Sequence, residues 1–321
     1  VLIGAVLWSL AWIWIRAEIG SRMDRTAERL RLAGYAVEWT SRKISGYPFR
    51  IDVTLEGVHL AERSGWALTA PEIKAEAYAY RLDQWIGYAS KGVVLTRPSS
   101  GAVAITGPAL RASYADTGRA SPRIAIEGLK LTFTPQAGAK PFVINSAQHF
   151  DFHLWPSGPD TAEFLLRVDQ ASAPPSAILA RIAQDKPMDI AWEAKASHLS
   201  ALHGGDWPAT AQSWAAAGGV LDIEHGMLTA GSTVLNLRPG RLGVGWDGRL
   251  RGGVGLDLRQ APNIIHALAE ANAIDPSAAD SAMSVARARA GGGAVTQADL
   301  TFLAGVTAFG PVAVGPAPKV Y

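Results

Sequence analysis

The chain begins with an apolar segment that is closed by an arginine. Residues 1–16 read VLIGAVLWSLAWIWIR, with no charged side chain before Arg16. A helix needs about 20 apolar residues to cross a bilayer, so the pattern predicts a transmembrane anchor over 1–16 that is truncated at its start. Trp8, Trp12 and Trp14 gather toward Arg16, the position at which indole rings favour the boundary between lipid and water. A cleaved signal peptide is the alternative, but no small-x-small cleavage site follows.

A helical pattern continues after the apolar segment. In residues 17–34, Met23, Ala27 and Leu30 fall on one stripe, and Gly34 is a typical helix stop. We therefore predict an amphipathic helix over 17–34 that continues the anchor and lies on the folded body. Arginines and acids are mixed here, so charge bias does not determine the topology across a membrane.

After this helix the hydrophobic period changes to two. Apolar residues alternate with polar ones over 51–55, and again over 58–60 after Gly57 shifts the phase. This pattern predicts either a bulged strand or two strands that meet at Gly57. Similar β-rich runs, separated by turns that contain glycine and proline, recur along the chain, and their spacing is typical of an antiparallel meander.

Short helical patterns interrupt the strand series. Ala-Pro-Pro at 173–175 breaks the alternation and opens a short helix, so we place a boundary there between two β-rich halves, 35–172 and 173–321. Further helical patterns lie near 208–217, 261–273 and 277–290. The expected fold class is α+β and β-rich: a long curved antiparallel meander, a long N-terminal helix as membrane anchor, and a few short helices.

Composition narrows the classes of function. Hydrophobic residues make up 48% and charged residues 18% of the chain, against a usual charged share of about 25%. The formal net charge is only +2, and basic residues are interspersed with acids, so we expect no nucleic-acid partner. The absence of cysteine excludes thiol catalysis, thiolate zinc sites and disulfides.

One glycine pattern matches a nucleotide-binding signature. Gly243, Gly245 and Gly248 spell G-x-G-x-x-G, but a strand-like segment follows where dinucleotide binding requires a helix. We interpret them as hairpin glycines. No nucleophile elbow, phosphate-binding loop or H-E-x-x-H helix occurs, so we expect neither an enzyme nor a bound cofactor or metal.

One polar cluster could carry chemistry. His149, Asp151 and His153 alternate with apolar residues, so on a strand they share one face. The two histidines would lie about 13 Å apart along the backbone, which is too far for easy joint ligation of one metal. A solvated polar face is therefore the preferred interpretation, and a metal or catalytic site with ligands from elsewhere is the alternative.

Residues 44–50 read ISGYPFR and open an alternating strand. The segment resembles the N-terminal signature of the bacterial domain of unknown function 2125 family, in which a Gly-aromatic-Pro-Phe-Arg motif follows a membrane anchor and an amphipathic helix. Residues 66–77, 214–223 and 309–321 are also similar to that family, so the resemblance covers nearly the whole chain.

The motif carried by this resemblance is structural and brings no catalytic residue with it. It consists of Gly46, Tyr47, Pro48, Phe49 and Arg50. Gly46 and Pro48 are suited to a fixed turn, Phe49 to the core, and Arg50 to an ion pair with an acid.

The architecture is more distantly similar to AsmA-like envelope proteins, whose curved sheets offer an apolar trough to lipids. Both resemblances imply a single-pass anchor in the bacterial inner membrane, with the body in the periplasm. We therefore expect a non-enzymatic protein that binds or guides lipid, or another apolar envelope component, along a sheet groove. The alternative is a non-enzymatic envelope scaffold that holds a protein partner. A hydrolase or metal enzyme around His149, Asp151 and His153 is a third hypothesis.

Overall fold

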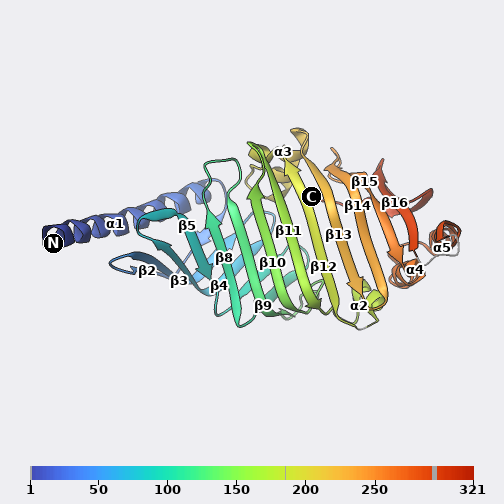
Figure 1. The fold of residues 1–321 in the computed structure, drawn as a ribbon, viewed down its shortest axis with the longest axis horizontal. Helices are drawn as coiled ribbons and strands as arrows, with labels where there is room; N and C mark the ends of the chain where they lie inside the picture. Colours follow the sequence, from blue (N-terminus) through green and yellow to red (C-terminus); the bar gives the residue numbers. More distant parts are fainter. Residues whose placement is uncertain (1, 185, 291–294) are drawn as a thin grey trace.

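The protein is one long antiparallel sheet with a projecting N-terminal helix and a few short helices, as Figure 1 shows. The computed structural model describes residues 2–184, 186–290 and 295–321. Within them the sheet has 18 strands, which confirms the β-rich class and the antiparallel meander. The helices are α1 (Leu2–Leu32), α2 (Ile178–Ala183), α3 (Trp207–Ala216), α4 (Ala261–Glu270) and α5 (Pro276–Ala290), with a 3-10 turn at Leu199–Ala201.

The strands follow the sequence in two series. The first series is β1 (Ala36–Glu38), β2 (Ser41–Ser45), β3 (Arg50–Ala61), β4 (Ala67–Tyr78), β5 (Arg81–Tyr88), β6 (Val93–Arg97), β7 (Gly101–Thr106), β8 (Ala109–Ala115) and β9 (Arg123–Pro135). The second is β10 (Ser146–Pro156), β11 (Thr161–Ala171), β12 (Met188–Ser197), β13 (Val220–Ala230), β14 (Thr233–Val244), β15 (Leu250–Arg259), β16 (Val295–Leu303), β17 (Val306–Phe309) and β18 (Val312–Pro316).

From β9 to β18 each strand pairs with the next, but between β4 and β9 the sheet divides. One part of β4, residues 74–78, pairs with β5, and another part, residues 67–69, pairs with β6. The two branches rejoin at β9, which pairs with β8 over 123–129 and with β7 over 132–135. The strands β4, β5, β8, β9, β7 and β6 therefore close a ring, which the alternating sequence did not reveal.

Helix α1 is continuous across Arg16, so the predicted anchor and the predicted amphipathic helix are one helix. It ends as expected at Gly34, which has a φ of 99°. The amide of Tyr35 donates to the carbonyl of Leu30, and that of Gly34 donates to the carbonyl of Arg31. These two bonds satisfy free carbonyls of the last turn, as in a Schellman motif.

The phase change at Gly57 is confirmed, and it occurs within a single strand. Glu56 pairs with Glu72 of β4, and Val58 with Ala70, so the register is the same on both sides of Gly57. Gly57 adopts a φ of 59°, which rotates the strand without an inserted residue. The expected bulge and the expected break between two strands are therefore both absent from this pairing.

The sheet continues through residue 173, where we placed a boundary. Strands β11 and β12 pair along their length, from Thr161 opposite Ser197 to Ala171 opposite Met188. The largest cluster of buried apolar residues likewise includes side chains from both sides of residue 173. The predicted short helix, α2, lies in the loop between these two strands.

Candidate functional site

One face of the sheet is apolar across most of its width. Residues directly opposite each other on paired strands point to the same face, so the register defines continuous rows. The row through Phe152 contains no charged side chain and consists of Ile44, Val53, Ala75, Gly87, Ala112, Ile126, Phe152, Leu166, Trp192, Gly226, Leu237, Leu256 and Ala298.

The two neighbouring rows have the same character. The row through Leu154 consists of Trp85, Tyr114, Ile124, Leu154, Phe164, Ala194, Ile223, Gly240, Val254, Leu300 and Phe309. The row through Phe150 consists of Leu110, Gly128, Phe150, Val168, Ile190, Leu228, Leu235, Leu258 and Thr296. We call these three rows the inner face.

The burial of the inner face varies from one end of the sheet to the other. Toward the C-terminus Leu256 and Leu258 are 5% and 3% exposed, in one cluster with residues of α2, α4 and α5. In the middle of the sheet Phe152, Leu166 and Trp192 are only half-buried. Large apolar side chains in a filled core are almost fully buried, so the middle of the inner face is partly open.

Helix α1 packs on the other end of this face. Trp12 and Ile19 are buried in a cluster with Ile51 and Val53 of β3. Ala27 is 3% exposed, Met23 is half-buried, and Leu30 is 37% exposed at the edge of the contact. Most of the predicted apolar stripe is therefore confirmed as a packing surface.

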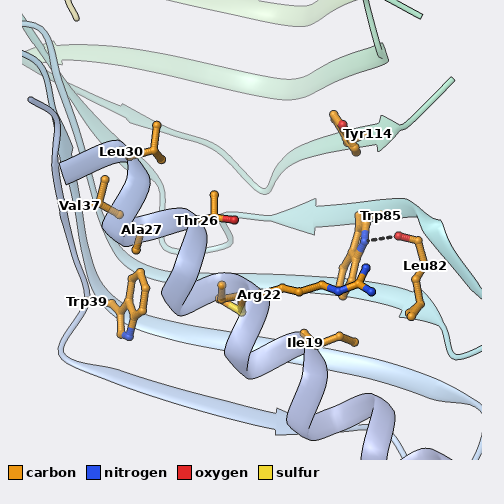
Figure 2. A pocket seen from close by; sticks show the side chains of 11 residues that line it. Ile19, Arg22, Thr26, Ala27, Leu30, Val37, Trp39, Leu82, Trp85 and Tyr114 are labelled. Carbon is orange, nitrogen blue, oxygen red and sulfur yellow. Dashed lines mark hydrogen bonds between the residues drawn. The ribbon is translucent and has the colours of Figure 1, made fainter. Parts of the chain in front are cut away.

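Three of the cavities among the described residues lie at this end of the sheet. The helix cavity, about 520 Å³, lies between α1 and strands β5 and β8; Figure 2 shows Ile19, Ala27 and Leu30 on one side and Trp85 and Tyr114 on the other. The indole of Trp85 donates to the carbonyl of Leu82 at 2.9 Å, which fixes that wall. Trp85 and Tyr114 are paired members of the inner face.

The other two cavities each share lining residues with a neighbouring cavity. The edge cavity, about 390 Å³, shares Leu30 and Val37 with the helix cavity and also includes Leu68. The ring cavity, about 360 Å³, shares Leu68 with the edge cavity. Its lining is Leu68, Ile73, Gly87, Tyr88, Ala89, Val93, Ile105, Leu110, Arg111, Ala112, Ile126, Leu131, Phe133 and Phe150. Ligand pockets are typically about 300–1,000 Å³ and mostly apolar, so the ring cavity suits one slender apolar group.

The opposite, outer face of the sheet carries paired charges. Arg111 forms an ion pair with Glu127 of the neighbouring strand, and Arg167 donates to Asp169 at 2.9 Å. A hydrogen bond to Glu127 raises the pKa of Arg111, and one to Asp169 raises the pKa of Arg167. The charge of Asp151 adds to both shifts. A sheet with one apolar and one charged face is typical of an antiparallel sheet wetted on one side.

The predicted polar cluster lies on this outer face. His149, Asp151 and His153 alternate along β10, and Asp151 lies opposite Glu127 on one side and Arg167 on the other. Among the residues that the structure describes, no three histidine, aspartate or glutamate side chains are grouped so that they could hold a metal ion. The cluster therefore forms part of the charged ladder on the outer face.

Two glycines of the pattern, Gly245 and Gly248, form a turn as we interpreted them, whereas Gly243 lies at the end of strand β14. The amide of Gly245 donates to the carbonyl of Arg249 at 2.7 Å, and Gly248 has a φ of 74°. Strand β15 follows this turn directly, so no helix N-terminus faces the glycines.

The motif Gly46–Arg50 forms the turn between β2 and β3. Gly46 has a φ of 105°, and an added Cβ would lie 2.7 Å from the carbonyl oxygen of Arg50, so the turn requires glycine. Arg50 contacts Asp52 at 2.9 Å and Glu76 at 3.1 Å, which confirms the expected ion pair. The expectation that Phe49 enters the core is wrong, because this side chain is 63% exposed at the tip of the turn.

Two of the predicted interface tryptophans contact this turn. The indole of Trp8 donates to the carbonyl of Pro48 at 2.9 Å, and that of Trp12 donates to the carbonyl of Arg50 at 3.0 Å. The ring of Trp12 meets that of Tyr47 edge-on, with centroids 5.4 Å apart. Sequence reasoning missed this contact because nearly forty residues separate the partners.

Trp14 and Arg16 are exposed, and their interface role stays a prediction. None of the described helices combines the length and the apolar character of a bilayer span.

Comparison with known proteins identifies a family. The bacterial family DUF2125, described as "Uncharacterized protein conserved in bacteria", matches residues 12–318. No curated protein and no solved structure matches the chain.

Proposed function

The chain belongs to the bacterial family DUF2125, and from that premise we propose that it is an anchored inner-membrane protein whose periplasmic body binds or guides lipid. Another apolar envelope component would use the same surface. The observation that carries the proposal is the uncharged inner face, which begins at α1 and lines part of both the helix cavity and the ring cavity. The helix end itself supports the anchor, because residues 2–15 of α1 contain no charge.

The chemistry of the face suits an acyl chain. Removing one CH₂ group from water stabilises a complex by about 0.8 kcal/mol, and an uncharged face demands no compensating partner from the ligand. Arg22, Thr26 and Tyr114 bring polar groups to the helix cavity, whereas the lining of the ring cavity is almost wholly apolar. A lipid would therefore place its polar head near α1 and its chain toward the ring.

Filling the ring cavity tests the proposal. A Cβ added at Gly87 would lie 3.8 Å from its nearest neighbours, the carbonyls of Ala112 and Lys74, so Gly87→Leu projects into the cavity without a backbone clash. Gly243→Leu is the matched control, because its Cβ would lie 3.6 Å from the carbonyl of Gly219 on a position opposite Arg251, outside the inner face.

The measurement is the lipid that remains bound to the full-length protein after extraction from membranes, determined by native mass spectrometry. We expect bound lipid on the wild type and on Gly243→Leu, and a several-fold loss on Gly87→Leu. Wild-type protein that carries no lipid, or equal lipid on all three proteins, would contradict the proposal.

A scaffold role is the second candidate, favoured by Trp246, which is 90% exposed in the turn between β14 and β15. Large exposed indoles are common anchors of protein partners. Crosslinking in membranes separates the two functions, because a stoichiometric protein partner without bound lipid favours the scaffold.

A further inference from the structure

Four aromatic side chains gather at the end of the sheet beside α1. Tyr47 and Phe49 lie in the β2–β3 turn, and Tyr78 and Tyr80 lie where β4 passes into β5. They are 56%, 63%, 55% and 66% exposed. We call these four residues the aromatic rim.

The rim is one surface, because its two turns are joined. The amide of Ala79 donates to the carbonyl of Phe49 at 2.9 Å, and the rings of Tyr78 and Tyr80 stack with centroids 5.2 Å apart. Helix α1 passes beside the first turn, where the hydroxyls of Ser9 and Tyr47 are 2.8 Å apart. Both turns are therefore held at a fixed height along α1.

The exposed apolar surface continues from the rim onto the helix. Ile3, Val6, Leu7, Leu10 and Ile13 are all more than half exposed. Contiguous apolar surface of this kind marks an interaction site, and here it is shared by a helix and two β-turns.

The height of the rim along α1 points to a lipid surface as the occupant. The rim meets α1 at Trp8, Ser9 and Trp12, before the first charged residue, Arg16. A helix rises about 1.5 Å per residue, so Ser9 lies about 10 Å from Arg16 along the axis. The headgroup layer of a bilayer is about 5–8 Å thick on each side, so when the uncharged residues before Ser9 lie in the apolar core, the headgroup layer lies at the rim and Arg16 lies near its outer edge.

The side chains of the rim match that layer. Tyrosine rings combine an apolar body with a polar hydroxyl and concentrate at the boundary between lipid and water. Arg16 is exposed on α1 beyond the rim, at a position where a basic side chain is attracted to anionic lipid headgroups. Beyond Arg16 the helix becomes strongly charged, which fits a position outside the membrane.

We propose that the aromatic rim seats the body on the membrane at the depth of the lipid headgroups. The motif Gly46–Arg50 then contacts both α1 and the membrane surface. The helix cavity begins at Ile19, about 5 Å beyond Arg16 along the helix axis. A lipid that leaves the bilayer beside α1 meets this cavity first. The inference rests on the proposed anchor, and the experiment separates the two.

Because the chain contains no cysteine, single cysteines can be labelled without ambiguity. Fluorophores are placed on full-length Phe49→Cys, Tyr80→Cys, Leu7→Cys and Trp246→Cys protein in phosphatidylethanolamine–phosphatidylglycerol nanodiscs. The label at position 7 tests whether the start of α1 enters the membrane, and the label at position 246 is the control that is expected to stay in water. Tyr80→Cys is included because Phe49→Cys removes the contact of Phe49 with Trp8 and could disturb folding, whereas among the described residues the ring of Tyr80 stacks on Tyr78 of the same turn.

We expect lipids that carry a nitroxide at the headgroup to quench the labels at 49 and 80 several-fold more than the label at 246. If the label at 7 is quenched and those at 49 and 80 match 246, the rim does not touch lipid and the inference is wrong, while the anchor stands. If no label is quenched, both proposals fail. Labels at 49 and 80 that are shielded from aqueous quencher but not quenched by lipid would show a protein partner instead, which also overturns the inference.

Discussion

Trp12 and Trp14 lie two residues apart in α1 and have opposite surroundings. Trp12 is 6% exposed, with its ring against Tyr47 and its indole donating to Arg50, whereas Trp14 is 66% exposed. The sequence grouped both with Trp8 as interface residues, because composition alone does not distinguish a packed indole from a free one. The turn Gly46–Arg50 decides the difference, since only one side of α1 faces it.

Truncating Trp12 tests this difference. We expect Trp12→Ala to lower the free energy that is needed to detach α1 from the sheet by about 3–5 kcal/mol, because the substitution removes a buried ring. Trp14→Ala should change it by less than about 0.5 kcal/mol, because Trp14 is mostly exposed. Hydrogen exchange of α1 amides in full-length protein in detergent micelles measures both values. Equal effects of the two substitutions would show that the packing of Trp12 does not hold α1.

At the scale of elements, α1 is held to the sheet by polar contacts as well as by its apolar stripe. Arg42 of β2 contacts Asp24 at 2.6 Å and donates to the carbonyl of Gly20 at 3.2 Å. The hydrogen bond from Arg42 holds the pKa of Asp24 below its ordinary value. The apolar stripe predicted the helix, and the alternating pattern predicted the strands. Neither pattern predicted the bond between Arg42 and Asp24, because that bond depends on how the helix docks on the sheet.

This bond predicts a pH dependence. The folded pKa of Asp24 is lowered, so its contribution to stability is present above the ordinary aspartate pKa of about 3.9 and is lost as the pH falls through the lowered value. We expect the urea midpoint of the wild type to exceed that of Asp24→Asn near neutral pH and the two to converge in acid.

The control is Glu28→Gln, whose ion pair with Arg31 stays within the helix. It should leave the acid dependence close to that of the wild type. The effect of Asp24→Asn is expected to be small, since the carboxylate is 59% exposed. A constant difference between Asp24→Asn and wild type across the acid range would refute the linkage.

At the scale of the molecule, the sheet and its core run without a break from β9 to β18. The proline-rich segment at 173–175 predicted a boundary, because proline and a short helix interrupt alternation locally. Pairing of β11 with β12 restores the sheet beyond that interruption. We therefore expect both halves to unfold together.

Two matched core substitutions test this cooperativity. Leu131 in β9 and Leu256 in β15 belong to the same buried cluster and are 2% and 5% exposed. Leu131→Ala and Leu256→Ala should each cost about 2–5 kcal/mol and lower the protection of amides in both strands by the same amount. A loss of protection confined to the substituted half would instead establish two independent domains.

The sequence by itself determined the local structure: the long helix and its end at Gly34, the antiparallel strands, the glycine turn after β14 and the polar face of β10. Each depends on residues close together in the chain, through periodicity, capping and turn chemistry. Only the tertiary structure decided the ring of strands between β4 and β9, the contact of Trp12 with Tyr47, the exposure of Phe49 and the continuity of the inner face with α1. These depend on strand register and docking between residues far apart, which the period of a single strand does not specify.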